Sequence, residues 1–386
     1  MSELIYFDNS ATTKPLPEVA RRVFEQLTSD ESFGNPGSLH RLGGAAERVF
    51  QRAAEDTARI LRCSSEELVF TSCGSESVNT AILGYVRANP RAGKHILSTR
   101  TEHMATLSAL RLLEQEGYEV TYLPVLADGK INAALLESSI RNDTALITFT
   151  HVNNETGVIC DPEDVCRIRN RRNKATRIHF DCVQSLGKLP IRLDRGFVDM
   201  ASFSGHKIHA PKGVGLLYLR KGIRIKPLIL GGGQQRGLRS GTLSPYLAQA
   251  FALALSQAEE SRESSFAHVM MLREKLVAGL ASHRVCCLSP EHALPYVVNV
   301  SFPSFESETM LHALEEQDVY VSTVSACSSK KKNLSYVLTE MGIDRKTAGN
   351  AIRISFSRFS TEEEVEHFVR IIDNIYEKYS LIKGAT

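Results

Sequence analysis

Short apolar segments alternate with amphipathic segments through the middle of the chain. Seven apolar runs have the length and composition of buried strands, at 68–71, 95–98, 120–123, 145–150, 177–180, 200–203 and 214–219. Patterns with helical spacing fill most of the gaps between them, at 76–88, 104–116, 133–140 and 162–172. Strands and helices in alternation predict an α/β domain with a mostly parallel seven-stranded sheet flanked by helices.

The segments on either side of this alternation have a different pattern. Residues 1–14 are short and extended, and they precede helical patterns at 17–28 and 39–61. A glycine-rich segment leads into a helix at 243–261, and then helices and strands mix, at 266–281, 297–302, 307–317, 319–321, 351–355 and 362–379. We therefore expect two domains, a large α/β domain of residues 15–261 and a small α+β domain of residues 1–14 and 262–386.

Composition excludes several classes of function. The 46 basic and 44 acidic side chains leave a net charge of +2, which argues against direct nucleic acid binding as the main activity. No apolar run approaches the ~20 residues of a membrane span, and the first eight residues lack the features of a secretory signal. The eight cysteines include no Cys-x-x-Cys pair, so we expect no metal site, and we interpret them as free thiols of a cytoplasmic protein.

The predicted strand at 200–203 is followed by a lysine, Lys207, and by a turn rich in proline and glycine. Ligands of open α/β sheets bind at the carboxyl ends of the strands, so Lys207 is either an ordinary solvated lysine or a functional one. A functional lysine that bonds to a carbonyl group forms a Schiff base, and the commonest cofactor of this kind is pyridoxal 5'-phosphate (PLP). PLP is therefore a hypothesis that the other strand ends can test.

Other strand ends carry the groups that PLP needs. A hydroxyl-rich turn at 71–76 precedes a helix, where backbone N–H groups can bind a phosphate. Asp181 ends a strand, and a carboxylate there would keep the pyridine nitrogen protonated. His103 begins a helix and can stack on the ring, while Asn154 and Gln184 follow strands and can donate hydrogen bonds to the ring hydroxyl. Each signal alone is weak, because caps and turns commonly use these residues, but together they support PLP.

An ordered series of motifs covers nearly the whole chain. The motifs are Tyr6-Phe7-Asp8-Asn9-Ser10-Ala11-Thr12-Thr13, Gly34-Asn35-Pro36, Thr101-Glu102-His103, Val152-Asn153-Asn154-Glu155-Thr156-Gly157, Asp181-Cys182-Val183-Gln184, Ser204-Gly205-His206-Lys207, Arg239-Ser240-Gly241-Thr242, Ser325-Ala326-Cys327-Ser328-Ser329 and Ile352-Arg353-Ile354-Ser355. As an ordered set they resemble the motifs of the cysteine desulfurases in the class V aminotransferase family. The resemblance implies a fold type I PLP enzyme that takes sulfur from L-cysteine for iron–sulfur clusters or thio-modification.

The resemblance also implies a role for each matching position. Lys207 would hold PLP covalently and act as the catalytic base, Asp181 would pair with the pyridine nitrogen, and His103 would stack on the ring and shuttle protons. The other implied contacts are hydrogen bonds near the ring oxygen from Asn154 and Gln184, a phosphate grip by Gly74, Ser75, Ser204 and His206, and a substrate-carboxylate site at Arg353 with Asn35 and Asn154. Thr242 would reach the phosphate of the neighbouring subunit, which implies a homodimer with shared active sites.

Cys327 is the expected nucleophile. It lies in a small, polar segment followed by three lysines at 330–332, an environment that favours the thiolate. Four other cysteines lie in or near apolar patterns that predict buried, inert thiols, namely Cys63, Cys166, Cys286 and Cys287. Cys182 adjoins Asp181 at a strand end, and we expect it to be buried as well. Cys73 is the rival, because a phosphate-binding turn would lower its pKa. The resemblance implies that a persulfide on Cys327 passes sulfur to a protein acceptor such as an iron–sulfur scaffold or a sulfurtransferase.

Several positions depart from the family pattern. Cys73 and Ser357 stand where glycine is usual, Ser75 where threonine is usual, and Gln235 where glutamate is usual. Ser75 keeps a hydroxyl, so we expect the phosphate grip to be retained. The basic run at 330–332 bears on the choice of partner.

Two alternative functions remain open from the residues. The first is a selenocysteine lyase or another class V aminotransferase-like PLP enzyme that does not need Cys327. Comparing alanine formation from cysteine with alanine formation from selenocysteine would distinguish it from a cysteine desulfurase. The second is a non-catalytic sulfur carrier of the same fold, which a yellow, PLP-containing protein would exclude.

Overall fold

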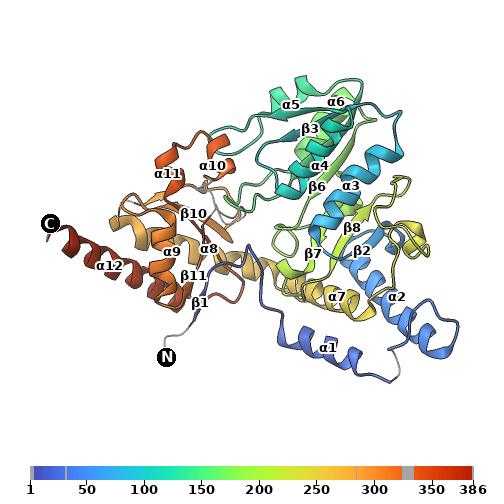
Figure 1. Cartoon of the computed structure of the whole chain (residues 1–386), viewed down its shortest axis with the longest axis horizontal. Coiled ribbons are helices and arrows are strands. Elements are labelled where there is room, and N and C mark those ends of the chain that lie inside the picture. The colour runs from blue at the N-terminus through green and yellow to red at the C-terminus, as the bar shows by residue number, and fades with distance from the viewer. Residues whose placement is uncertain (1–3, 31–32, 284, 324–333, 385–386) are drawn as a thin grey trace.

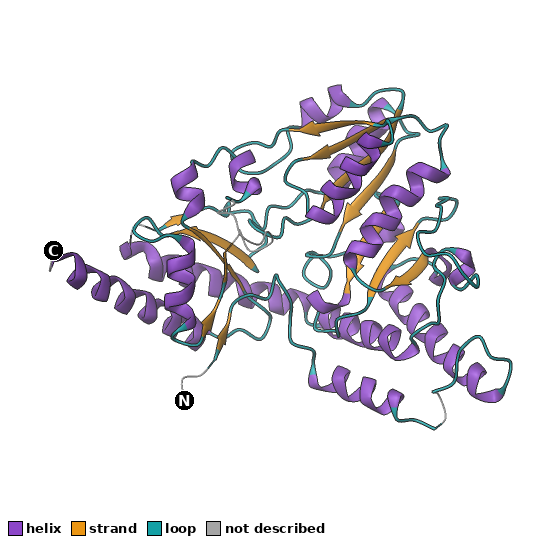
Figure 2. Ribbon diagram, viewed as in Figure 1, coloured by secondary structure: helices purple, strands orange, loops and turns teal. Residues whose placement is uncertain are grey.

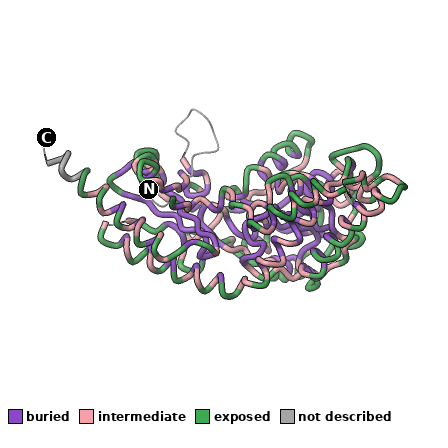
Figure 3. The backbone as a smooth tube through the Cα atoms, turned by 90° about the horizontal axis from the view of Figure 1, so that it is seen from below, coloured by how far each residue is buried: buried purple, intermediate pink, exposed green. Residues whose placement is uncertain are grey.

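The computed structural model describes residues 4–30, 33–283, 285–323 and 334–384. In Figure 1 the chain forms two adjoining units, each built around a β-sheet. The larger sheet has seven strands and the smaller has four, and helices surround both (Figure 2). Buried positions lie along the interior of both units, whereas exposed positions lie mainly on the outside (Figure 3).

The large sheet confirms the predicted strands and the mostly parallel arrangement. Its strands are β2 (Leu68–Thr71), β3 (His95–Thr99), β4 (Glu119–Leu123), β5 (Thr144–Thr150), β6 (Arg177–Asp181), β7 (Met200–Ser204) and β8 (Gly215–Leu219). Their order in space is β2-β8-β7-β6-β5-β3-β4. All pairings from β4 to β7 are parallel, and β8 runs antiparallel to both of its neighbours. The carboxyl ends of β3, β5, β6 and β7 therefore meet at one edge, where ligands of such sheets bind.

Helices cover both faces of this sheet because alternate residues of its strands point to opposite sides. Leu97 joins the core on one face and Ile96 the core on the other. The first face packs on α1 (Pro17–Leu27), α2 (Arg41–Leu61), α5 (Ala133–Ser139), α6 (Pro162–Arg172) and α7 (Pro245–Glu260). The second face packs on α3 (Gly74–Ala88) and α4 (Met104–Gln115).

The smaller unit combines an antiparallel sheet with helices from the C-terminal part of the chain. The sheet order is β12 (Ser322–Thr323), β13 (Ala351–Ser355), β10 (Val297–Ser301) and β9 (Cys286–Cys287). Beside it, β1 (Ile5–Tyr6) pairs in parallel with β11 (Val319–Tyr320). The helices are α8 (Arg262–Leu280), α9 (Ser307–Glu315), α10 (Tyr336–Glu340), α11 (Arg345–Gly349) and α12 (Glu362–Gly384). Ile5 and Phe7 of the N-terminal segment are buried in the core of this unit.

The prediction for two of the cysteines was wrong. Cys286 and Cys287 form the two-residue strand β9 at the edge of the small sheet, and both are exposed. An edge strand pairs on one side only, so an apolar pattern there does not ensure burial. Cys166 and Cys182 are buried as predicted, and Cys63 is half-buried.

None of the helices in the described ranges combines the length and the low polarity that crossing a bilayer requires.

Candidate active site

Lys207 lies where β7 leaves the sheet. All residues of β7 are buried, and the strand runs directly into a short 3-10 turn, Gly205–Lys207. The Lys207 ammonium donates hydrogen bonds to the backbone oxygens of Ser10 and of Ala11, the latter at 2.6 Å. Within the described residues, no ion pair joins Lys207 to a carboxylate.

The surroundings of Lys207 favour its neutral form. Burial and the positive charges of Arg353 and Lys188 lower its pKa to about 7, and the more weakly acting carboxylates of Asp8 and Asp181 oppose that change. An amine that loses its proton near neutral pH can act as a nucleophile or as a base. The functional interpretation of this lysine is therefore chemically consistent.

Asp181 ends β6, the strand beside β7, and is buried. One carboxylate oxygen accepts the backbone N–H of Val183 at 3.0 Å. Burial raises the Asp181 pKa, and the charges of His103 and Lys207 act in the opposite direction. A buried carboxylate whose negative charge is so little compensated by the protein is suited to pairing with a cationic ligand group such as a pyridinium.

His103 caps α4 at the same edge. Its Nδ1 accepts the backbone N–H of Ala105 at 3.1 Å, and the side chain is exposed. Because Nδ1 is an acceptor, the neutral ring carries its proton on Nε2. That proton is available to a group bound at the strand ends.

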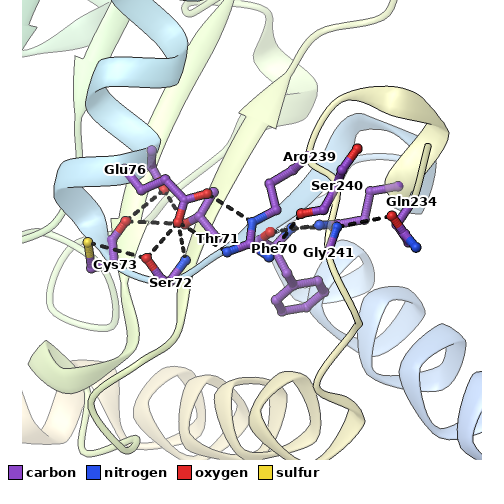
Figure 4. A network of polar contacts seen from close by, with 11 residues as sticks. Phe70, Thr71, Ser72, Cys73, Glu76, Gln234, Arg239, Ser240 and Gly241 are labelled. Atoms are coloured by element: carbon purple, nitrogen blue, oxygen red, sulfur yellow. Dashed lines mark hydrogen bonds and ion pairs between the residues drawn. The ribbon is translucent and has the colours of Figure 1, made fainter. Parts of the chain in front are cut away.

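The predicted phosphate turn leads into the N-terminus of α3. Cys73 holds the cap position without contributing a side-chain hydrogen bond, so backbone N–H groups of the first helical turn are not capped by it. Figure 4 shows Glu76 in a network with Ser72 and Arg239. Burial disfavours the Glu76 carboxylate, but the hydrogen bonds from Arg239 and Ser72 prevail and lower its pKa.

Two observations show that this turn fits a phosphate. The hydroxyl of Ser204 is buried and has no hydrogen-bond partner among the described residues. A Cβ added to Gly74 would lie 2.8 Å from Val183 Cγ2 and 3.3 Å from Ser204 Cβ, so this part of the turn has no room for a side chain. An uncapped helix N-terminus beside a buried, unsatisfied hydroxyl is a suitable site for an anion.

The other two predicted phosphate contacts differ in exposure. His206 is half-buried, and its Nδ1 lies 3.1 Å from the hydroxyl of Thr12. Burial and the nearby charges of Lys207 and Lys212 lower the His206 pKa to about 4, so its ring is neutral at pH 7. Ser75 is exposed.

Arg353 reaches the site from β13 of the smaller unit. Its Nη2 lies 2.8 Å from Asp8 Oδ1, its Nη1 donates to the backbone oxygen of Asn154 at 3.1 Å, and its buried Nε has no hydrogen-bond partner within the described chain. A guanidinium held on two sides with a free donor can bind a carboxylate. Asp8 was not among the predicted site residues, although it lies in the first motif of the series.

Gln184 is engaged with the protein itself. Its side-chain nitrogen donates to the Ser10 backbone oxygen at 3.0 Å, and its side-chain oxygen accepts from Lys188 at 3.4 Å. Asn154 is half-buried beside Arg353. These contacts bring the N-terminal turn, the end of β6 and Lys207 together.

Glu102 is a second buried acid that the sequence did not single out. Its two oxygens accept hydroxyl hydrogen bonds from Thr99 and Thr150, each at 2.7 Å. Burial, helped by the charge of Asp181, raises its pKa to about 7, although the two threonine bonds lower it. Its position immediately before His103 was the only available signal.

The structure explains the departure at Gln235. The Gln235 side chain accepts the backbone N–H of Phe70 at 2.7 Å and donates to the backbone oxygen of Phe70 at 2.8 Å. It thereby pairs both polar groups of a residue in the edge strand β2, as a neighbouring strand would. A glutamate carboxylate could not donate the second bond.

Two of the remaining predicted positions are exposed, and the third lies outside the described residues. Asn35 is exposed in the connection between α1 and α2, and Thr242 is exposed before α7. In Figure 1 the helix α2 lies on the opposite side of the molecule from the small sheet. Cys327 and the lysines at 330–332 lie outside the described residues.

A lysine, a buried acid and a turn that fits an anion, all at the carboxyl ends of a mostly parallel sheet, are the features of a fold type I PLP enzyme. More narrowly, the chain belongs to the class V aminotransferase family. The family described as "Aminotransferase class-V", which is PLP-dependent, matches residues 5–368.

Curated relatives and solved structures agree with this assignment. The chain is 42% identical to "Cysteine desulfurase IscS" of Serratia proteamaculans (strain 568), over 95% of this chain and 91% of the relative. It is also 42% identical to the protein of that name from Photobacterium profundum, over 97% of this chain and 93% of the relative. A solved structure named "NIFS-LIKE PROTEIN" matches with a TM-score of 0.92 and 39% identity, over 97% of this chain and 100% of that chain. Another, "SspA in complex with cysteine", matches with a TM-score of 0.81 and 32% identity, over 92% and 100%.

Proposed function

We propose that this protein is a PLP-dependent cysteine desulfurase, which converts L-cysteine to L-alanine and supplies sulfur for iron–sulfur cluster assembly or thio-modification. The observation that carries the proposal is Lys207, an amine with a depressed pKa that lies at a strand end beside a buried acid. The names of the relatives favour this activity over a selenocysteine lyase or a non-catalytic sulfur carrier.

Different residues of the site would bind different parts of PLP. Gly74, Ser75, Ser204 and His206 would bind the phosphate at the start of α3, while Asn154 and Gln184 would hydrogen-bond near the ring oxygen. His103 would stack on the ring, and Asp181 would hold a proton on the pyridine nitrogen. When bound, PLP supplies an electron-withdrawing ring that stabilises negative charge on the substrate Cα.

The chain's own side chains then act on the substrate. Arg353, kept in place by Asp8, would bind the carboxylate of L-cysteine. Lys207 would remove the Cα proton with Nζ, which its depressed pKa permits near neutral pH. His103 would exchange a proton with the sulfur groups through Nε2.

Sulfur transfer requires a nucleophile, and we propose Cys327 on the motif that contains it. Its thiolate would attack the substrate sulfur, so that a new S–S bond forms as the Cβ–S bond breaks. The electron pair of the broken bond stays with the carbon fragment, which takes up protons and leaves as alanine. The persulfide would then be transferred to a protein acceptor, such as an iron–sulfur scaffold or a sulfurtransferase.

We also propose a homodimer and the domain division predicted above. Asn35 and Thr242 are both exposed in one chain, as side chains that act at a neighbouring subunit's site would be. Pairing of β1 with β11, together with burial of Ile5 and Phe7, supports assigning residues 1–14 to the small domain. A cytoplasmic location agrees with the seven free cysteines in the described residues.

The test compares Cys327→Ser with its matched control Cys73→Ser. Both variants should bind PLP and show a change in its visible absorption when cysteine is added, because Lys207, Asp181 and Arg353 are intact. Cys327→Ser should lower alanine formation by a factor on the order of 10² or more and form no protein persulfide, since an unactivated serine is a poor nucleophile. Cys73→Ser should turn over nearly as the parent does. The opposite pattern would contradict the assignment of Cys327, and normal turnover by Lys207→Ala would contradict the whole proposal.

A further inference from the structure

Lys188 is a buried lysine that the proposed reaction leaves unused. It follows β6 in the chain, its residue exposure is 9%, and within the described residues it forms no ion pair with a carboxylate. Its ammonium lies 5.5 Å from the centre of the Tyr296 ring and donates one hydrogen bond, to Gln184, at 3.4 Å. Buried lysines are rare unless a partner compensates their charge, so the position calls for a reason.

A chain of hydrogen bonds connects Lys188 to Lys207. Lys188 donates to the side-chain oxygen of Gln184, whose nitrogen donates to the backbone oxygen of Ser10 at 3.0 Å. The ammonium of Lys207 donates to that same oxygen of Ser10. Because an ammonium can only donate, Lys188 obliges the Gln184 oxygen to face it, which turns the amide N–H groups toward Ser10.

The shared acceptor is itself held in place. The backbone N–H of Ser10 donates to Ser355 Oγ at 2.9 Å, and the Asn9 side chain donates to the backbone oxygens of Tyr6 and Ser355, each at 3.0 Å. The Ser10 oxygen is therefore a fixed point between Gln184 and Lys207. A change at Lys188 can reach Lys207 along this path without any contact between the two lysines.

We propose that Lys188 is a positioning residue that acts through Gln184 and the Ser10 backbone oxygen to hold the Lys207 amine and to favour its uncharged form. This inference rests on the proposed role of Lys207 as the lysine that binds PLP. The like charge of a buried ammonium disfavours a second positive charge nearby, and burial weakens the screening that water would provide. The effect of Lys188 on the pKa of Lys207 has this sign.

Other charged groups act on Lys188 or Lys207, or are acted on by them, and any experiment on Lys188 must leave these groups unchanged. Those that act on Lys207 are Arg353 from β13, Asp8 from the N-terminal segment and Asp181 from β6, and the charge of Lys188 also reaches His206 and His209. Substitutions at Lys188 alone leave all of these groups in the protein.

The experiment measures the pH midpoint of the visible absorption of PLP bound to the holoenzyme, a readout that does not depend on turnover. Lys188→Met removes the charge and the donor, Lys188→Gln removes the charge but keeps a donor, and Lys188→Arg keeps both. We expect the midpoint to rise by about one unit in the Met and Gln variants, because a neighbouring positive charge is lost. The Arg variant should titrate as the wild type does.

Lys212→Met is the matched control, because Lys212 is exposed and its charge acts on His206 but is not among the charges that act on Lys207. Its midpoint should equal that of the wild type. Lys188→Gln keeps a polar head group and provides the answer if Lys188→Met does not fold. Unshifted midpoints in the folded Met or Gln variants would overturn the inference alone. A wild-type protein that shows no visible absorption with PLP would overturn the proposed function and this inference together.

Discussion

Two buried aspartates beside neighbouring strands of the large sheet have opposite surroundings. Asp199, which immediately precedes β7, has no exposed surface and accepts the backbone N–H of Ile178 at 2.8 Å. Three arginines surround its carboxylate: Arg169 at 3.5 Å, Arg177 at 3.3 Å, and Arg220. Arg177 and Arg220 also donate hydrogen bonds to it. Its charge is thus fully used within the protein, and it links α6, β6, β7 and the end of β8.

Asp181 stands at the other end of the same pair of strands. It ends β6, accepts one hydrogen bond from Val183, and has two basic side chains, His103 and Lys207, as the neighbours that act on its charge. Burial raises its pKa because these neighbours compensate the charge only in part. Unlike Asp199, this carboxylate retains capacity for a ligand.

The difference follows from the direction of the strands. β6 and β7 are parallel, so Asp199 lies at their amino ends and Asp181 at their carboxyl ends. Connections at the amino ends pack closely and can supply arginines, whereas the crevice at the carboxyl ends is where ligands bind. A buried carboxylate whose charge is fully compensated by cationic side chains therefore indicates a structural role. A buried carboxylate whose charge is only partly compensated indicates a functional site.

The largest effect should come from Asp181→Asn. The amide can still accept the Val183 N–H, so we expect the fold to survive. The loss of charge should weaken the ring as an electron acceptor and lower turnover by roughly 10²–10⁴-fold. Alanine formation and circular dichroism melting measure the two parts of the prediction. Asp194→Asn, at an exposed ion pair with Arg192, is the control and should turn over normally. Normal turnover of Asp181→Asn would mean that another group serves the pyridine nitrogen.

Asp199→Asn should have the converse effect. Removing one partner of a buried ion pair leaves uncompensated charge, which costs about 3–5 kcal/mol of unfolding free energy. The midpoint of urea unfolding should therefore fall, while the remaining folded enzyme turns over at nearly the normal rate. The same control, Asp194→Asn, should leave the urea midpoint nearly unchanged, because water screens its exposed ion pair with Arg192. An Asp199→Asn variant that keeps its stability but loses activity would contradict the structural role assigned to Asp199.

Glu102→Gln should have the smallest effect, and the effect should depend on pH. The raised pKa of Glu102, about 7 in the folded protein against 4.5 for an unperturbed group, means that the folded state binds the extra proton between these values. The resulting stabilisation is fully present below pH 4.5 and is lost as pH rises through 7. The stability of the wild type relative to Glu102→Gln should thus fall as pH increases across this window. A difference that stays constant with pH would show that Glu102 does not titrate there.

Much of the fold could be predicted because its signals are local. Each strand of the large sheet has its own apolar run, and each following helix has its own periodicity, so the prediction needed no long-range information. The short elements β9, β12, α10 and α11 were missed because two to five residues are too few to form a pattern. The exposure of Cys286 and Cys287 was missed because it depends on where β9 sits in the sheet.

The candidate site divides in the same way. Lys207, Asp181 and His103 could be found because each follows or ends a recognisable strand. The partners of these residues could not, because Ser10 is 197 residues from Lys207 and Asp8 is 345 residues from Arg353. No periodic pattern carries information over such separations.

The sequence by itself determined the succession of strands and helices along the chain, the residues at the strand ends and the motifs that the family shares. Only the tertiary structure decided which of those residues share surroundings: that Asp199 is compensated by three arginines while Asp181 is not, and that Lys188 connects to Lys207 through Gln184 and Ser10. The physical reason is that chain direction and apolar periodicity are encoded locally, whereas compensation of a buried charge depends on segments that meet only when the sheet and the N-terminal turn assemble.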